Sequence, residues 1–240
     1  MKYLNSRPLI CAYDGPVIFE HPSELARRLA TGELDLALVP VFEALRTPGY
    51  SIADGVAVGC DGPVFSVILA YRGELGDVRR VGLDPASLTS ANLLRVILAE
   101  FHGLRPEFGS EGDARLIIGN QAIDFRMNEE SRDGWTVLDL GAEWKRCTGL
   151  PFVFAVWAMR PQVGRGAAEA LRGLKREGVA RIPELIRTEA FGTEDVREEY
   201  LTRCIRYEVG VAEREAIAVF RALLAAHGLL PPGGEPLCFV

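Results

Sequence analysis

The 240-residue sequence contains no long apolar run. A helix that crosses a membrane needs about 18 or more apolar residues with few charges, and no stretch of this chain approaches that length. The first residues include one lysine but neither the apolar segment nor the small-residue cleavage site of a signal peptide. These absences predict a cytoplasmic protein with no membrane partner.

Paired cysteine patterns are also missing. The five cysteines are odd in number and share no Cys-x-x-Cys spacing, so they indicate reduced thiols that fill the core. They are Cys11, Cys60, Cys147, Cys204 and Cys238. Reduced thiols agree with the cytoplasm, because disulfides persist mainly in oxidising compartments.

Motifs of metal and nucleotide chemistry are absent as well. His21, His102 and His227 have no metal-like spacing to one another or to cysteine, so we expect them at the surface or at helix ends. There is no G-x-S-x-G, P-loop or G-x-G-x-x-G motif. The net charge is −6 with both signs interspersed, which argues against a nucleic-acid partner. We therefore expect neither a metal nor an organic cofactor.

The residues that are present alternate between helix and strand patterns, which predicts an α/β fold. The apolar run 36–39, stopped by Pro40, is typical of a strand buried in a parallel sheet. We expect further strands at 62–73, 80–84, 114–120 and 152–159, helices at 22–32, 87–103 and from 166 onward, and a helix near Pro8 with Asn5 or Ser6 as N-cap.

Two long strands about ninety residues apart enclose a compact α/β segment. This arrangement predicts two lobes, one formed by 1–67 with 158–240 and the other by 68–157. Ligands of such proteins bind in the cleft between the lobes, near the ends of strands.

The best candidate for ligand binding is the start of the helix that follows residue 86. Ser87, Thr89 and Ser90 cluster there, and unpaired N–H groups at a helix start attract a carboxylate or phosphate. A plain N-cap is the alternative, although it needs only one hydroxyl. Ser66, in an apolar strand where the lobes should join, is a ligand contact or a satisfied core serine.

Two amide-bearing segments complete the predicted cleft. Asn120 follows Gly119 at the end of a strand, where either a cleft residue or a turn residue is expected. Asn5, Ser6 and Arg7 occupy another helix start and could meet an anion in the same way. Together these residues indicate a cleft suited to a small carboxylate.

Several segments resemble the chorismate dehydratase family of the futalosine route to menaquinone. In chain order they are YLNSRPL, GELDLALVPV, GPVFSV, LDPASLTSANLL, LIIGN, DLGAEW, TGLPFVFAVW and IRYEVGVAEREAIAVF. Their order and spacing cover nearly the whole chain. The resemblance implies a type II periplasmic-binding-protein-like fold, with two mixed sheets flanked by helices and a ligand cleft between the lobes.

The resemblance also implies an activity. The family removes water from chorismate to give 3-[(1-carboxyvinyl)oxy]benzoate, without a cofactor. Asn5 would then be the catalytic residue, and Ser6, Arg7, Ser66, Ser87, Thr89, Ser90 and Asn120 would bind the substrate. An amide is a very poor base, so either Asn5 assists proton removal or it orients a carboxylate of the substrate that takes the proton.

Two positions depart from the family pattern. Leu88 stands where the family has arginine, and Asn120 stands where it has aspartate. We expect the substrate carboxylates to be held by neutral donors, with Arg7 compensating from the other lobe. A non-catalytic cytosolic binding protein for a small carboxylate is the alternative function. The sister enzyme that makes dihydroxynaphthoate is disfavoured, because no motif region carries its acid–base histidine. We expect a monomer or a homodimer.

Overall fold

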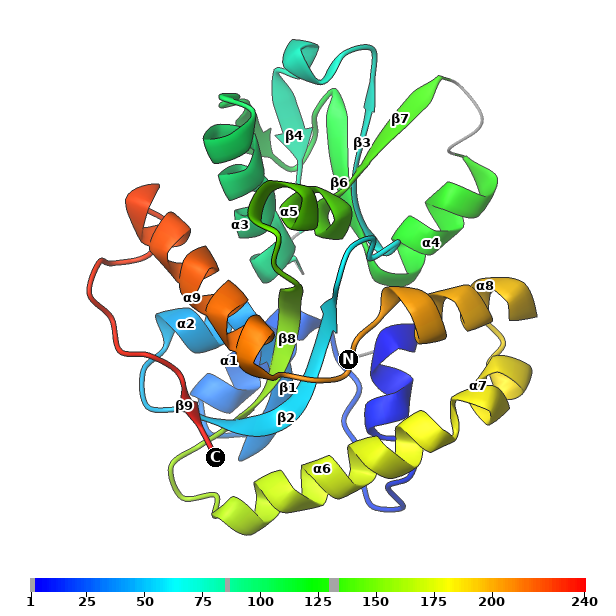
Figure 1. Ribbon diagram of the computed structural model, residues 1–240, viewed down its shortest axis with the longest axis vertical. Coiled ribbons are helices and arrows are strands. Elements are labelled where there is room, and N and C mark those ends of the chain that lie inside the picture. Colours follow the sequence, from blue (N-terminus) through cyan, green and yellow to red (C-terminus); the bar gives the residue numbers. More distant parts are fainter. Residues whose placement is uncertain (1–2, 85–86, 130–133) are drawn as a thin grey trace.

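The computed structural model describes residues 3–84, 87–129 and 134–240. Two β-sheets form two lobes, each with helices packed on its faces (Figure 1). No helix in these ranges is long and apolar enough to cross a membrane. The α/β, two-sheet architecture predicted from the sequence is confirmed.

The first lobe contains a four-stranded sheet in the order β1-β8-β2-β9. The strands are β1 (Leu36–Pro40), β2 (Ser51–Cys60), β8 (Phe152–Met159) and β9 (Cys238–Phe239). Strand β8 is antiparallel to β1 and β2, whereas β9 is parallel to β2. The expectation that 36–39 lies in a parallel sheet is therefore wrong. Helices cover the strand, and burial produces the same continuous apolar run whatever the direction of the neighbouring strand.

The helices of the first lobe come from both ends of the chain (Figure 1). They are the 3₁₀ helix η1 (Leu4–Leu9), α1 (Pro22–Ala30), α2 (Val41–Arg46), α6 (Arg165–Ala180), α7 (Ile182–Thr188), α8 (Glu194–Glu199), the π-helical turn η4 (Tyr200–Cys204) and α9 (Val211–Ala226). Tyr3, rather than Asn5 or Ser6, precedes η1 as its N-cap. The expected helix near Pro8 is thus present but begins earlier.

The second lobe contains a five-stranded sheet in the order β5-β4-β6-β3-β7. The strands are β3 (Val67–Arg72), β4 (Arg80–Gly82), β5 (Glu107–Gly109), β6 (Ala114–Ile118) and β7 (Trp135–Asp139). Strand β4 is parallel to β5 and β6, and β3 is antiparallel to β6 and β7, so this sheet is also mixed. A short 3₁₀ turn, η2 (Leu75–Asp77), links β3 to β4.

Alternation along β3 shows how helices cover both faces of the second sheet. Leu69 belongs to the main core, whereas Ile68 and Ala70 form a separate cluster with Ala122 and Phe125. Helix α4 (Gly119–Asn128) therefore covers one face. Helices α3 (Leu88–Val96), with its π-helical continuation η3 (Ile97–Phe101), and α5 (Leu140–Thr148) pack toward the main core.

The chain crosses between the lobes twice. Residues 62–66, expected to be the first part of a long strand, instead belong to a crossing loop, residues 61–66, before β3. The return crossing precedes Phe152, because β8 pairs with β1 and β2 along its whole length. The predicted boundary at 157/158 lies within this strand. We propose that one lobe is formed by 3–60 with 152–240, and the other by the described residues 67–84, 87–129 and 134–149.

Candidate functional site

A small cavity lies where the two lobes meet. Its walls come from η1, the crossing loop, the start of α3, the end of β6 and strand β8, and its volume is about 60 Å³. It is lined by Tyr3, Asn5, Pro22, Pro40, Val58, Val64, Ser66, Val67, Ser87, Leu88, Thr89, Ser90, Ile118, Gly119, Phe154, Ala155 and Ile205. None of these described residues is charged, so a ligand carboxylate would meet only neutral donors.

The position of Ser66 depends on Asp139, the N-cap of α5. The Asp139 carboxylate accepts hydrogen bonds from the backbone N–H groups of Val64 (3.0 Å) and Phe65 (2.8 Å) in the crossing loop. It also accepts from Gly141 and Ala142 in the first turn of α5. Phe65 has φ 66°, a left-handed conformation that is uncommon for a residue other than glycine. Asp139 thus stabilises the strained turn that directs Ser66 toward the cavity.

Behind Ser66 lies Tyr200, a fully buried residue of η4. Its hydroxyl is 2.7 Å from the Ser66 oxygen, and the Asn5 side chain is a second hydrogen-bond partner. Burial raises the pKa of Tyr200 well above its usual range, although both hydrogen bonds oppose the rise. Tyr200 therefore remains a neutral hydrogen-bonding group at physiological pH.

Two buried polar atoms facing this region have no hydrogen-bond partner among the residues that the structure describes. They are the amide oxygen of Asn5 and the hydroxyl oxygen of Ser87. An unpaired buried polar atom costs about 1–3 kcal/mol, so such atoms are uncommon in stable folds without a functional reason. Both residues line the cavity, which makes this the strongest candidate for a ligand site.

The start of α3 faces the same cavity. Ser87 precedes α3 as its N-cap but makes no side-chain capping bond, which contradicts the plain N-cap alternative for this residue. Thr89 has a structural contact, because its hydroxyl oxygen accepts from the backbone N–H of Phe42 in α2 of the other lobe (3.2 Å). Ser90 is buried and also lines the cavity. Residues 85–86 of the sequence motif lie outside the described residues.

Three predicted residues lie away from this cavity. Arg7 pairs with Glu189 of the loop after α7 (2.6 Å) and stacks over the Phe19 ring, outside the lining of this cavity. The Ser6 hydroxyl donates to the Tyr3 carbonyl oxygen (2.9 Å). Asn120 lies in the first turn of α4, not at the end of a strand, and its amide oxygen accepts from the Leu4 N–H (3.1 Å) across the two lobes.

A glycine allows the close approach of the lobes beside Asn120. Gly119 has φ 61°, and a Cβ atom there would lie 2.6 Å from the Tyr3 ring. Glycine is therefore needed both for the backbone conformation and for the contact. Burial, together with the nearby Asp84 carboxylate, raises the pKa of Tyr3 to about 12.

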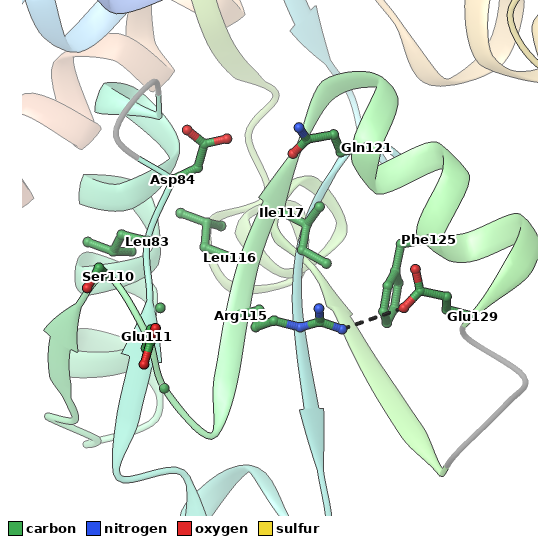
Figure 2. Close-up of a pocket in the computed structure, with 12 residues that line it drawn as sticks. Leu83, Asp84, Ser110, Glu111, Arg115, Leu116, Ile117, Gln121, Phe125 and Glu129 are labelled. Atoms are coloured by element: carbon green, nitrogen blue, oxygen red, sulfur yellow. Dashed lines mark ion pairs between the residues drawn. The ribbon is translucent and has the colours of Figure 1, made fainter.

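A larger hollow, of about 570 Å³, lies beside α4 over β4 and β6 (Figure 2). Arg115 crosses its floor, where it pairs with Glu129 (3.7 Å) and stacks over the Phe125 ring. None of the predicted site residues lines this hollow, and none of the unpartnered buried polar atoms found in the described residues belongs to it. The smaller interlobe cavity is therefore the better candidate.

The described residues contain no group of three His, Cys, Asp or Glu side chains that could hold a metal ion. His102 pairs with Glu143 (2.7 Å), and His227 pairs with Glu100 (3.0 Å). Neither histidine is among the residues that line the cavity.

Sequence reasoning missed Tyr200 and Asp139. Asp139 lies within a recognised motif, and its place just before a helix was a signal for an N-cap. Tyr200 and Leu201 form an apolar pair between charged residues, which suggests a buried helical face but gives no sign of a contact with Ser66.

Known proteins resemble the chain over most of its length. A family model described as menaquinone biosynthesis matches residues 1–226. A chorismate dehydratase from Thermus thermophilus is 31% identical, over 93% of this chain and 93% of that protein. A chorismate dehydratase from Campylobacter jejuni is 25% identical, over 91% of this chain and 88% of that protein.

Solved structures share the two-lobed fold. Protein AF1704 from Archaeoglobus fulgidus superposes with a TM-score of 0.74 at 18% identity, covering 95% of this chain and 96% of that one. The periplasmic aliphatic sulphonate binding protein of Escherichia coli has a TM-score of 0.58 at 17% identity, covering 92% and 78%. These identities establish the periplasmic-binding-protein-like fold alone. The family is shown by the model that matches residues 1–226 and by the 31% identity to the Thermus thermophilus protein: the chain belongs to the menaquinone biosynthesis family, as the sequence motifs predicted.

Proposed function

We propose that the protein is a chorismate dehydratase that converts chorismate to 3-[(1-carboxyvinyl)oxy]benzoate and water. The observation that carries this proposal is the unpartnered Asn5 amide oxygen, buried in the wall of the interlobe cavity within the motif YLNSRPL. Relatives with this activity align over 93% and 91% of the chain. The site residues and their roles are part of the proposal.

The start of α3 is the proposed binding site for a substrate carboxylate. A helix start carries about half a positive charge, and Ser87 and Ser90 add hydroxyl donors beside it. The Ser87 hydroxyl is available to a ligand, because it has no hydrogen-bond partner among the described residues. Each neutral donor to a charged group contributes about 1.5–3 kcal/mol, so a few such donors can replace the missing arginine.

The reaction removes the hydrogen at ring carbon C3 and the hydroxyl at C4. The C3–H electron pair forms the new ring double bond as the C4–O bond breaks, and the departing hydroxyl leaves with the proton as water. The cavity lining contains no carboxylate or imidazole among its described residues. This favours a carboxylate of the substrate as the base, with Asn5 orienting the reacting groups. Aromatisation drives the step, so no redox cofactor is needed.

The lobes must separate to admit the substrate. The cavity of about 60 Å³ is far below the roughly 300–1,000 Å³ of typical ligand pockets. Two hydrogen bonds cross between the lobes at its edge, from Phe42 N–H to Thr89 and from Leu4 N–H to Asn120. Closing over the substrate would exclude water from the reacting groups.

The direct test is to incubate the purified protein with chorismate and to follow the aromatic product by chromatography and absorbance. We expect turnover that falls at least about tenfold in Asn5→Ala, which corresponds to about 1.4 kcal/mol of transition-state stabilisation. Arg203→Ala is a matched control, because Arg203 is exposed and pairs only with Glu199 on the surface. Binding of chorismate without any product would instead establish the non-catalytic binding protein.

A further inference from the structure

The hydrogen bonds around Tyr200 have a definite direction. A phenol hydroxyl has one hydrogen, and Tyr200 is more acidic than serine, so it is the better donor in the 2.7 Å contact with Ser66. If Tyr200 donates, the Ser66 oxygen accepts, and the hydrogen of Ser66 is left for a partner on the cavity side. Ser66 is thereby presented to the cavity as a donor.

The same phenol orients Asn5. The Asn5 side chain is hydrogen-bonded to the Tyr200 oxygen, whereas the buried amide oxygen of Asn5 has no partner among the described residues. These two observations assign the amide nitrogen to the phenol and the amide oxygen to the cavity. The Asn5 amide then donates to the Tyr200 oxygen, and the Tyr200 hydroxyl donates to Ser66. Each of these two hydrogen bonds polarises the other, which strengthens both where water is excluded.

We propose that Tyr200 is a positioning residue, whose hydroxyl presents Ser66 as a donor and the Asn5 amide oxygen as an acceptor to the molecule bound between the lobes. Tyr200 does not itself line the cavity, so it acts through these two side chains. The effect of this positioning on turnover rests on the proposed dehydratase function. The Ser66 hydroxyl would stabilise the negative charge that develops on the departing oxygen of C4. The Asn5 amide oxygen would orient the groups that react at C3.

Tyr200 is suited to this task because it is held rigidly and stays neutral. It is fully buried, and its phenol is 134 positions from Ser66 in the sequence, so the contact joins the first lobe to the crossing loop. A tyrosinate would turn the donor into an acceptor and reverse the orientation of Ser66. Burial opposes that ionisation by raising the pKa of Tyr200.

The test compares Tyr200→Phe with Tyr207→Phe. Both changes remove one phenol hydroxyl from a buried ring, but the Tyr207 hydroxyl has no hydrogen-bond partner within the described part of the chain. In Tyr200→Phe we expect kcat to fall at least tenfold, with KM within about threefold of the original value. Tyr207→Phe should change neither. Equal kinetics in both variants, with an active unmutated protein, would overturn the positioning role.

Two further measurements separate positioning from a general loss of structure. In the double variant, the loss of kcat should be smaller than the product of the losses in Tyr200→Phe and Ser66→Ala, because both changes act on the same hydroxyl. Fully multiplicative effects would contradict the proposal.

Crystal structures of the two phenylalanine variants give a readout that needs no activity. In Tyr200→Phe alone, the Ser66 hydroxyl or the Asn5 amide should turn from its original rotamer, and unchanged rotamers would refute the positioning role.

The dehydratase function fails separately, if the unmutated protein gives no aromatic product from chorismate. The crystal structures would then still decide whether Tyr200 orients Ser66 and Asn5.

Discussion

Replacing Thr89 by valine should destabilise the protein rather than only weaken ligand binding. Helix α2 begins after Pro40, which has no side chain able to cap it. Its Phe42 N–H is instead capped by the Thr89 hydroxyl, which reaches across from the other lobe (3.2 Å). Valine has nearly the same shape as threonine but cannot accept this hydrogen bond. The perturbation is therefore confined to one buried donor.

The size of the effect follows from that donor. Leaving a buried N–H unsatisfied costs about 1–3 kcal/mol of unfolding free energy. For a chain of 150–250 residues, each kcal/mol lowers the melting temperature by about 2–4 °C. The Thr89→Val protein should therefore melt about 2–12 °C lower than the original. Thr89→Ser keeps the hydroxyl and should recover most of this loss, apart from the removed methyl group.

Urea unfolding followed by circular dichroism measures this difference, with Ser90→Ala as the contrasting variant. Ser90 lines the cavity and is proposed to bind a substrate carboxylate, so its removal should weaken binding with little change in stability. A Thr89→Val protein with the original unfolding midpoint would refute the capping role. If the Thr89→Val protein were as stable as the original but bound chorismate weakly, Thr89 would be a ligand-binding residue with no capping role.

Three other predictions concern groups around the cavity. Arg7→Ala should leave KM for chorismate within about twofold of the original value, because Arg7 pairs with Glu189 outside the cavity. A partly exposed pair of this kind contributes about 0–1 kcal/mol to stability. A tenfold rise in KM would contradict this placement. The unfolding free energy should fall as pH rises above about 10, because unfolded tyrosines ionise there, whereas burial raises the pKa of Tyr3, Tyr200 and Tyr207 in the folded protein. Urea titrations between pH 8 and 11, with Tyr207→Phe showing a shallower fall, check the sign. Dialysis against a chelator should leave turnover unchanged, and a loss restored by one specific metal would contradict this.

The sequence alone predicted many of the elements and the family. Apolar runs such as 36–39 predicted strands because a covered strand is apolar on both faces. The order of the motifs predicted the family, and the hydroxyls at the start of α3 were expected in the cleft. These features are local in the chain or depend on the spacing of residues, so no knowledge of packing was needed.

Tertiary structure decided everything that depends on residues far apart in the chain. The antiparallel pairing of β1 with β8 was not visible in either segment, because both read as buried strands. Arg7 was expected to compensate for the missing arginine, and the structure pairs it with a residue far along the chain, Glu189, outside the lining of the cavity. Tyr200 reaches Ser66 only because η4 packs beneath the crossing loop that Asp139 stabilises. A side chain's hydrogen-bond partners depend on the packing of the whole chain, and packing alone brings Asn5, Ser66 and Tyr200 to one point.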